Sequence, residues 1–98
     1  MSKLQKKAFV GQVTAISIFK DNVFCGIGCN LLVFNCYDGS NILDYTSPNS
    51  FTFHEIVVET IKDEILIHLC GEKSYERIRV IENFSKIQTE ISIELEDW

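Results

Sequence analysis

VTAISIFKDNVFCGIGCNLLVFN, the stretch from Val13 to Asn35, decides how the rest of this 98-residue chain is interpreted. It contains three apolar runs rich in β-branched and aromatic residues: Val13–Phe19, Val23–Ile27 and Leu31–Phe34. Polar turn residues and glycines separate the runs, so the stretch predicts three short antiparallel strands joined by tight turns. The second and third runs are apolar on both faces, and both sides of the predicted sheet must therefore be covered.

The remaining chain continues the same pattern of short runs and turns. The loop at residues 46–50 divides the chain into two halves. Residues 84–97 fit the pattern of a helix and that of a strand, and their β-branched isoleucines favour the strand. The further strands that we expect are Ala8–Gly11, Asn41–Tyr45, Glu55–Ile61, Ile65–Cys70, Arg77–Ile81 and Ile87–Leu95.

The two halves of the chain match each other. The segment at residues 19–23, FKDNV, corresponds to residues 61–65, IKDEI, at an offset of 61 − 19 = 42 residues. A four-stranded unit of about 40–45 residues is the period of a β-propeller blade. The sequence therefore predicts an all-β chain of two consecutive four-stranded antiparallel blades, residues 12–46 and 54–96, which form an incomplete WD-repeat-like propeller. A single eight-stranded sandwich is the alternative.

Composition and charge narrow the class of protein. Hydrophobic residues make up 46% of the chain and only one residue is proline, so the chain has enough apolar surface to fold as one small domain. No apolar stretch is long enough to span a bilayer, and no signal-peptide pattern follows the N-terminal lysines. We therefore expect a cytosolic or nuclear protein. Its formal charge of −5 disfavours direct contact with nucleic acid.

The residue types that usually carry chemistry form no recognisable site. The cysteines lack paired C-x2-C spacing, which predicts small buried side chains and no metal site. A glycine-x-glycine turn at residues 26–28 lacks the third glycine and the following helix of a dinucleotide site, so it predicts a tight hairpin and close packing. Neither histidine has a catalytic partner at a motif spacing, and we expect no catalytic or cofactor-binding residue. The residues considered are Cys25, Cys29, Cys36, Cys70, His54 and His68.

Short motifs in both halves resemble one family. They are Val13-Thr14-Ala15-Ile16, residues 23–28 and 31–34, His54, Gly71, Lys73, Arg77-Ile78-Arg79-Val80 and the terminal Asp97-Trp98. Together they resemble the first two blades of the WD-repeat regulatory subunits of tRNA 2′-O-methyltransferases that act at the first anticodon position.

The resemblance implies a non-catalytic cytoplasmic scaffold. In such a complex the methyltransferase catalytic subunit carries the active site and the methyl donor, while the propeller holds the enzyme and helps to place the tRNA. The implied partners are thus the catalytic subunit directly and tRNA indirectly, with no DNA and no membrane. The alternative is a self-contained small β domain that binds a protein or a small ligand, or acts as an enzyme with a reactive cysteine, in a pocket built from Cys25, Cys29, His54 or His68.

Overall fold

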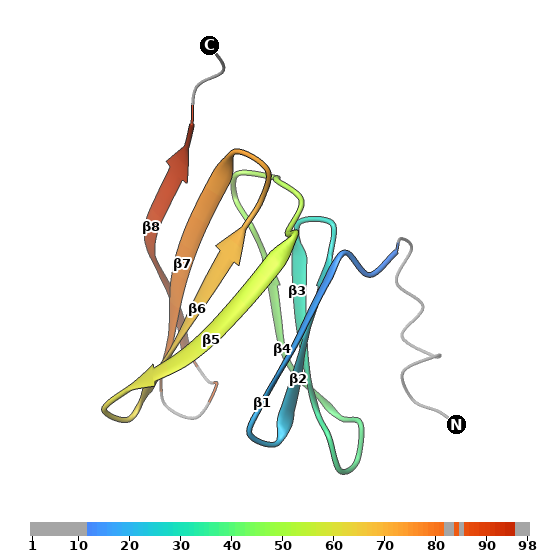
Figure 1. Ribbon diagram of the computed structural model, residues 1–98. Coiled ribbons are helices and arrows are strands. Elements are labelled where there is room, and N and C mark those ends of the chain that lie inside the picture. The colour runs from blue at the N-terminus through green and yellow to red at the C-terminus, as the bar shows by residue number, and fades with distance from the viewer. Residues whose placement is uncertain (1–11, 82–83, 85, 96–98) are drawn as a thin grey trace.

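Two four-stranded antiparallel β-sheets form the fold in the computed structural model, which describes residues 12–81, 84 and 86–95 (Figure 1). The first sheet contains β1 (Ala15–Phe19), β2 (Asn22–Ile27), β3 (Asn30–Asn35) and β4 (Asn41–Thr46). The second sheet contains β5 (Glu55–Ile61), β6 (Glu64–Cys70), β7 (Ser74–Ile81) and β8 (Lys86–Glu94). The strands of each sheet are paired in chain order, and none of the described residues lies in a helix. The expected all-β class and the two consecutive four-stranded sheets are confirmed.

The strand boundaries differ from the expected ones mainly in the second sheet. The strand interpretation of the ambiguous last segment is confirmed, because β8 pairs with β7 along its length. The expectation that β7 begins at Arg77 is wrong, since Tyr75 and Glu76 already pair with Cys70 and Leu69. The sequence pattern missed this start because Glu76 is a charged residue at a buried position. The expected strand Ala8–Gly11 lies outside the described residues.

The matched sequence segments form the same hairpin. In β1–β2 the pair Phe19 and Asn22 closes a two-residue turn, and in β5–β6 the pair Ile61 and Glu64 does the same. The first central residue of each turn has a left-handed backbone, with φ of 56° at Lys20 and 60° at Lys62. A positive φ at this position gives a two-residue turn the twist of the strands it joins. Equivalent sequence thus produces equivalent local structure in both halves.

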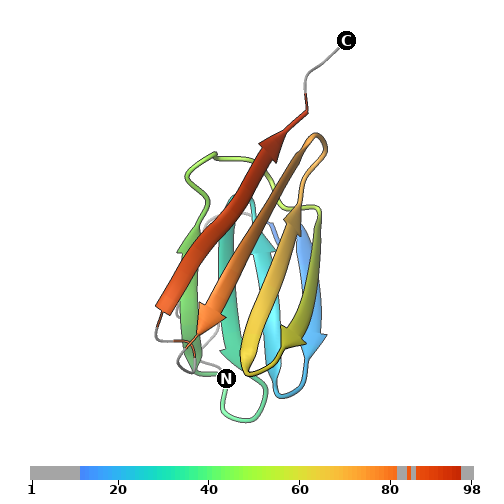
Figure 2. The same ribbon diagram turned by 90° about the vertical axis from the view of Figure 1, so that its left-hand side faces the viewer.

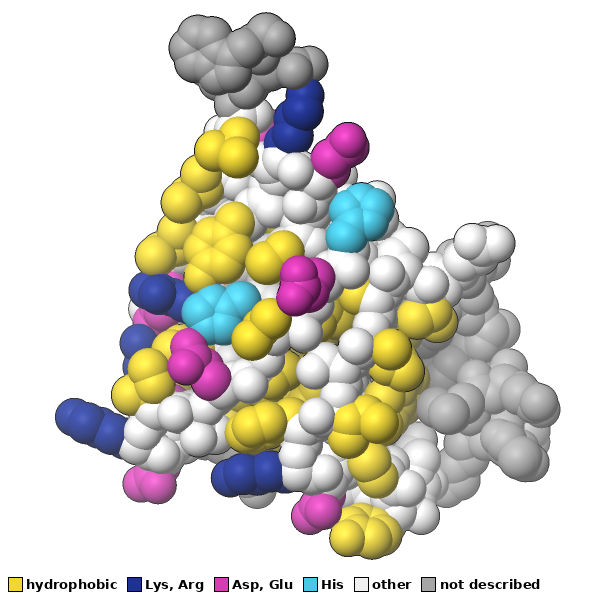
Figure 3. All heavy atoms as spheres, in the orientation of Figure 1, with side chains coloured by type: hydrophobic (Ala, Val, Ile, Leu, Met, Phe, Trp, Pro, Cys, Tyr) yellow, Lys and Arg dark blue, Asp and Glu magenta, His cyan; other side chains and the backbone are white. Residues whose placement is uncertain are grey.

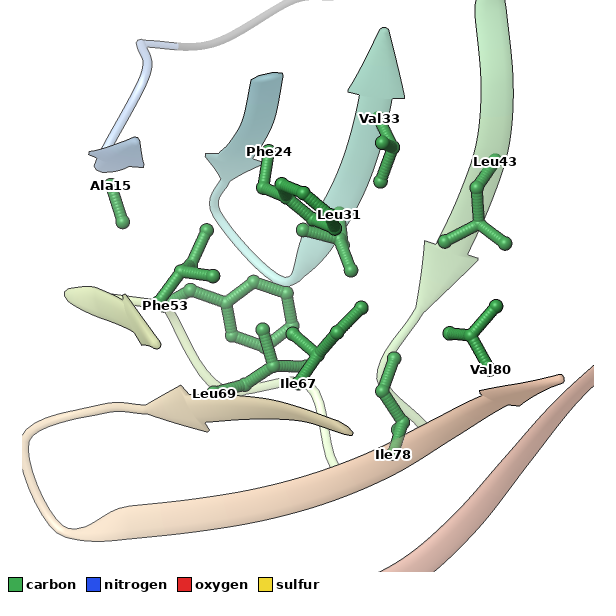
Figure 4. Close-up of a cluster of buried hydrophobic side chains, with 11 residues drawn as sticks. Ala15, Phe24, Leu31, Val33, Leu43, Phe53, Ile67, Leu69, Ile78 and Val80 are labelled. Atoms are coloured by element: carbon green, nitrogen blue, oxygen red, sulfur yellow. The ribbon is translucent and has the colours of Figure 1, made fainter. Parts of the chain in front are cut away.

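The two sheets pack face to face around one hydrophobic core, as the view in Figure 2 shows. Both sheets supply fully buried side chains to it, and Phe53, from the connection between the sheets, fills its centre (Figure 4). Full burial of each such side chain contributes about 1.5–3 kcal/mol. The core residues are Ala15, Phe24, Leu31, Val33, Leu43, Phe53, Ile56, Ile67, Leu69, Ile78 and Val80. The sheets pair with each other at neither edge, so they do not close into a barrel.

Two glycines lie where the backbone is closely packed against the connection between the sheets, tightly at Gly26 and with no room for a side chain at Gly71. A Cβ atom at Gly26 would lie 3.2 Å from the Cβ of Phe53 and 3.4 Å from the Cδ1 of Ile56, so this glycine has the packing role expected for it. A Cβ atom at Gly71 would lie 2.8 Å from the carbonyl oxygen of Thr52. Glycine at both positions lets the connection between the sheets lie directly on the strands.

Equivalent positions in the two sheets point in the same direction along the stack. The pair Ala15 and Gly26 of the first sheet corresponds to Val57 and His68 of the second, since 57 − 15 = 42 and 68 − 26 = 42. Ala15 faces the second sheet and is buried, whereas Val57 faces away from the first sheet, because its neighbour Ile56 lies in the core. Equivalent faces of the two sheets therefore point in the same direction, so that the sheets pack through non-equivalent faces.

Replacement of Gly71 by alanine tests the close packing of the inter-sheet connection. We expect Gly71→Ala to lower the free energy of unfolding by about 1–3 kcal/mol, because the new methyl group requires the backbone at Thr52 to move. Urea denaturation followed by circular dichroism measures the change. Glu72→Ala, at the exposed neighbouring position, is the control and should change the stability by less than about 0.5 kcal/mol. Equal stability of Gly71→Ala and wild type would contradict the packing described.

Candidate functional site

Of the residues proposed for an enzymatic pocket, the structure separates Cys25 from His68, whereas the turn with Cys29 lies beside the segment with His54, since the N–H of Phe53 donates to the carbonyl of Gly28 at 2.8 Å. Cys25 lies on the face of the first sheet that points away from the core, because its neighbour Phe24 lies in the core. His68 lies on the opposite outer face of the second sheet, so both sheets stand between these two side chains. Cys29 lies in the β2–β3 turn, and His54 is exposed just before β5. Cys25 and His68 are therefore not brought together.

Cys25 and Cys70 do not have the environment of an activated cysteine. All four cysteines are free. Burial raises the pKa of the Cys25 thiol, and burial followed by the nearby carboxylate of Glu55 raises the pKa of the Cys70 thiol. A nucleophilic cysteine needs the opposite shift, because the thiolate is the reactive form.

The described residues offer neither a metal cluster nor a membrane helix. Within residues 12–81, 84 and 86–95, no three His, Cys, Asp or Glu side chains form a group that could hold a metal ion. In the same residues no helix is long and apolar enough to cross a bilayer. Any functional site in this part of the chain must therefore be built from other features.

Two open hollows flank the β6–β7 turn. One has a volume of about 320 Å³ and the other of about 240 Å³. The residues that line the larger are Phe51, Thr52, His54, Glu72, Lys73 and Ser74. The smaller shares the turn residues and adds the apolar side chains of Tyr75, Ile93 and Leu95. Both are open to solvent and neither encloses a ligand as a typical small-molecule site does.

The outer face of the second sheet carries two hydrogen-bonded polar networks. His68 contacts the carboxylate of Glu59 through Nε2 and the hydroxyl of Tyr75 through Nδ1, both at 2.7 Å. Beside them, the Nε of Arg77 donates to Glu90 at 2.9 Å. Arg79 donates to Glu90 and to Glu64, and the bond from Arg79 is the main cause that lowers the pKa of Glu90. Leu66, whose neighbours on the adjacent strands are Glu59 and Arg79, is buried on this face.

Apolar side chains are exposed in two rows, one on β1 and one on β5, which are the first strands of the two sheets. The β1 row consists of Ile16 and Ile18, whose side chains are 62% and 71% exposed. The β5 row consists of Val57 and Ile61, which are 44% and 46% exposed. Figure 3 shows hydrophobic side chains uncovered over both strands. Exposed apolar surface of this kind on two adjacent strands is typical of a contact site, and we treat the two rows as the candidate functional surface.

A buried carboxylate that the sequence analysis missed joins the two sheets. Glu76 on β7 is fully buried on the inner face. It accepts hydrogen bonds from the hydroxyl of Ser47 at 2.9 Å, from the amide of Asn49 at 3.2 Å and from the hydroxyl of Tyr45. Burial, and then the bond to Glu76, raises the pKa of Tyr45 to about 12. The network connects β4 and the loop at residues 47–49 with the second sheet. The signal that could have revealed it is the alternation of Glu76 with Ile78 and Val80 along β7.

Comparison with known proteins identifies no relative. No protein-family model matches the chain, and no curated protein or solved structure is significantly similar to it.

The labelling rates of the thiols test the conclusion about the cysteines. Because the pKa of Cys25 and Cys70 is raised, their reaction with iodoacetamide should become fast only at a higher pH than that of the same thiols in the unfolded chain. Mass spectrometry after timed labelling in buffer and in denaturant measures both profiles. The exposed Cys36 is the internal control and should be labelled before either of them. Faster labelling of Cys25 or Cys70 in the folded protein would contradict the structure and would favour the enzymatic alternative.

The titration of Tyr45 predicts how stability depends on alkaline pH. Its phenol has a pKa of about 12 in the folded chain, against about 10 in an unfolded one. The stabilising contribution of the protonated phenol is therefore complete below pH 10 and is lost as the pH rises toward 12. Urea midpoints measured across this range should fall more in wild type than in Tyr45→Phe, which keeps the ring and the other two tyrosines. Identical pH profiles for the two proteins would contradict the assignment.

Proposed function

We propose that this chain is a non-catalytic scaffold made of two consecutive WD-repeat-like propeller blades. The observation that carries the proposal is that equivalent positions of the two sheets point the same way along the stack. Propeller blades repeat in this way, because the same side of each blade packs on the opposite side of the next. In a simple sandwich, each sheet instead has one apolar inner face, and the residues that alternate with it point outward and are polar. In a stack of this kind each end sheet keeps one free face, and the exposed β1 and β5 rows lie on those faces.

The surface chemistry supports a protein partner over a nucleic acid. Arg77 and Arg79 are the only arginines in the chain, and both are paired with carboxylates. With a formal charge of −5 and its arginines occupied, the described surface has little attraction for phosphate groups. The apolar rows on the inner strands instead suit contact with another folded protein surface.

The resemblance of the sequence motifs supports a specific partner for the scaffold. On that basis we propose that it acts in the cytoplasm as a regulatory subunit that binds the catalytic subunit of a tRNA 2′-O-methyltransferase. Transfer of the methyl group then belongs to the catalytic subunit, and the tRNA is reached through the complex.

Co-expression with the catalytic subunit tests this function. The chain should co-purify with a methyltransferase that acts at the first anticodon position, and not with a tRNA 2′-O-methyltransferase that acts elsewhere in the tRNA, which is the matched control. Mass spectrometry of tRNA fragments should detect methylation with the complex and none with the chain alone. Failure to co-purify would overturn the proposed partner, and methyl transfer by the chain alone would overturn the non-catalytic assignment.

A further inference from the structure

The contact between β1 and β5 involves positions whose equivalents in the other sheet are exposed. Within the chain, β1 packs against β5, and Ala15 and Phe19 of β1 lie on the same core side as Ile56 and Val58 of β5. The offset of 42 residues maps Ala15 to Val57 and Phe19 to Ile61, which form the exposed β5 row. The β5 row thus occupies the positions through which β1 makes its contact.

By the same offset, the β1 row corresponds to the residues of β5 that take part in the contact with β1. Val58, which packs against the core, corresponds to Ile16, since 58 − 16 = 42. Ile16 and Ile18 face away from the core, because their neighbours Ala15 and Phe19 belong to it or pack against it. A β1 row laid on a β5 row would therefore reproduce, with apolar residues on both sides, the packing that joins the two sheets within one chain.

The neighbouring side chains permit such a contact. On the outer face of the second sheet, several polar groups beside the β5 row already have partners: Glu59 contacts His68, and Arg77 and Arg79 donate to Glu90. Glu55, at the start of β5, is exposed on the same face. Covering groups that have partners costs less than covering an isolated charge. On the outer face of the first sheet, Leu32 and Phe34 are already buried. The most exposed apolar residues of that face are thus those of the β1 row.

We propose that a second copy of this chain binds head to tail, with its β1 row stacked on the β5 row of the first. A second copy is the occupant because the chain carries both halves of the contact and already joins two sheets through the same positions. Such a contact uses different surfaces on the two copies, so it can be repeated from copy to copy. This inference rests on the blade-like stacking proposed above and does not depend on the methyltransferase partner.

Two single substitutions and their mixture test the contact. Sedimentation velocity of the full chain over a range of concentrations should show wild type associating. Ile18→Lys removes the β1 row and Ile61→Lys removes the β5 row, and each alone should weaken association by about tenfold or more because a charge then faces apolar surface. Mixed in equal amounts, they should form dimers that do not grow, because the intact β5 row of Ile18→Lys meets the intact β1 row of Ile61→Lys. Both substitutions introduce the same charge, so attraction between them cannot cause the rescue.

The control is Leu95→Ser, at a side chain that is 64% exposed just after β8, the strand at the opposite edge of the second sheet from β5, and it should associate as wild type does. Circular dichroism confirms that each variant is folded, and Ile18→Ser and Ile61→Ser replace any lysine variant that is not. A wild-type chain that stays monomeric overturns the proposal, as does association that survives in both single variants. Two monomeric variants that stay monomeric when mixed also overturn it. None of these results bears on binding to the methyltransferase, which co-purification measures separately.

Discussion

The structure depends on one constraint, which is that a four-stranded sheet with apolar residues on both faces must be covered on both. The first sheet illustrates this, because β3 has four consecutive buried apolar residues, Leu31 to Phe34. Leu31 and Val33 are covered by the second sheet, and each such side chain contributes about 1.5–3 kcal/mol when removed from water. One partner sheet covers only one face. The stack meets the constraint at its centre. On its outer faces the constraint is met over β3, where Leu32 and Phe34 are buried, and is left unmet along β1 and β5, where the two rows are exposed.

Hydrogen bonding adds orientation to this non-directional packing. Hydrophobic faces alone allow two sheets to slide or turn against each other, since apolar contact has no preferred direction. The carboxylate of Glu76 restricts this freedom, because it is fully buried and its bonds come from Tyr45, Ser47 and Asn49, which lie on β4 and the loop that follows. A buried carboxylate that lost these partners would be strongly destabilising. The network thus specifies how the outer edge of one sheet sits on the other.

The direction of stacking connects the fold to the proposed functions. When sheets repeat along a stack, the outer face of the first sheet is equivalent to the buried face of the second, and the outer face of the second is equivalent to the buried face of the first. When two sheets bury equivalent faces against each other, neither outer face is equivalent to a buried one. The exposed β1 and β5 rows follow from this arrangement. Both the proposed scaffold function and the proposed head-to-tail contact use these rows. A scaffold in a larger assembly and self-association through the same rows are two ways to cover surface that the chain itself cannot cover.

The sequence by itself determined the strands, the turns and the division into two matched units, because these depend on local alternation and on turn residues such as Lys20-Asp21 and Lys62-Asp63 that act over a few positions. Its prediction that the cysteines are small buried side chains is wrong, because Cys36 is exposed and Cys25, Cys29 and Cys70 are only partly buried. Only the tertiary structure decided where β7 begins, which partners surround Glu76, and that Cys25 and His68 lie on opposite outer faces. These features depend on which face of one sheet meets which face of the other, and period-two alternation assigns residues to faces without saying what covers each face.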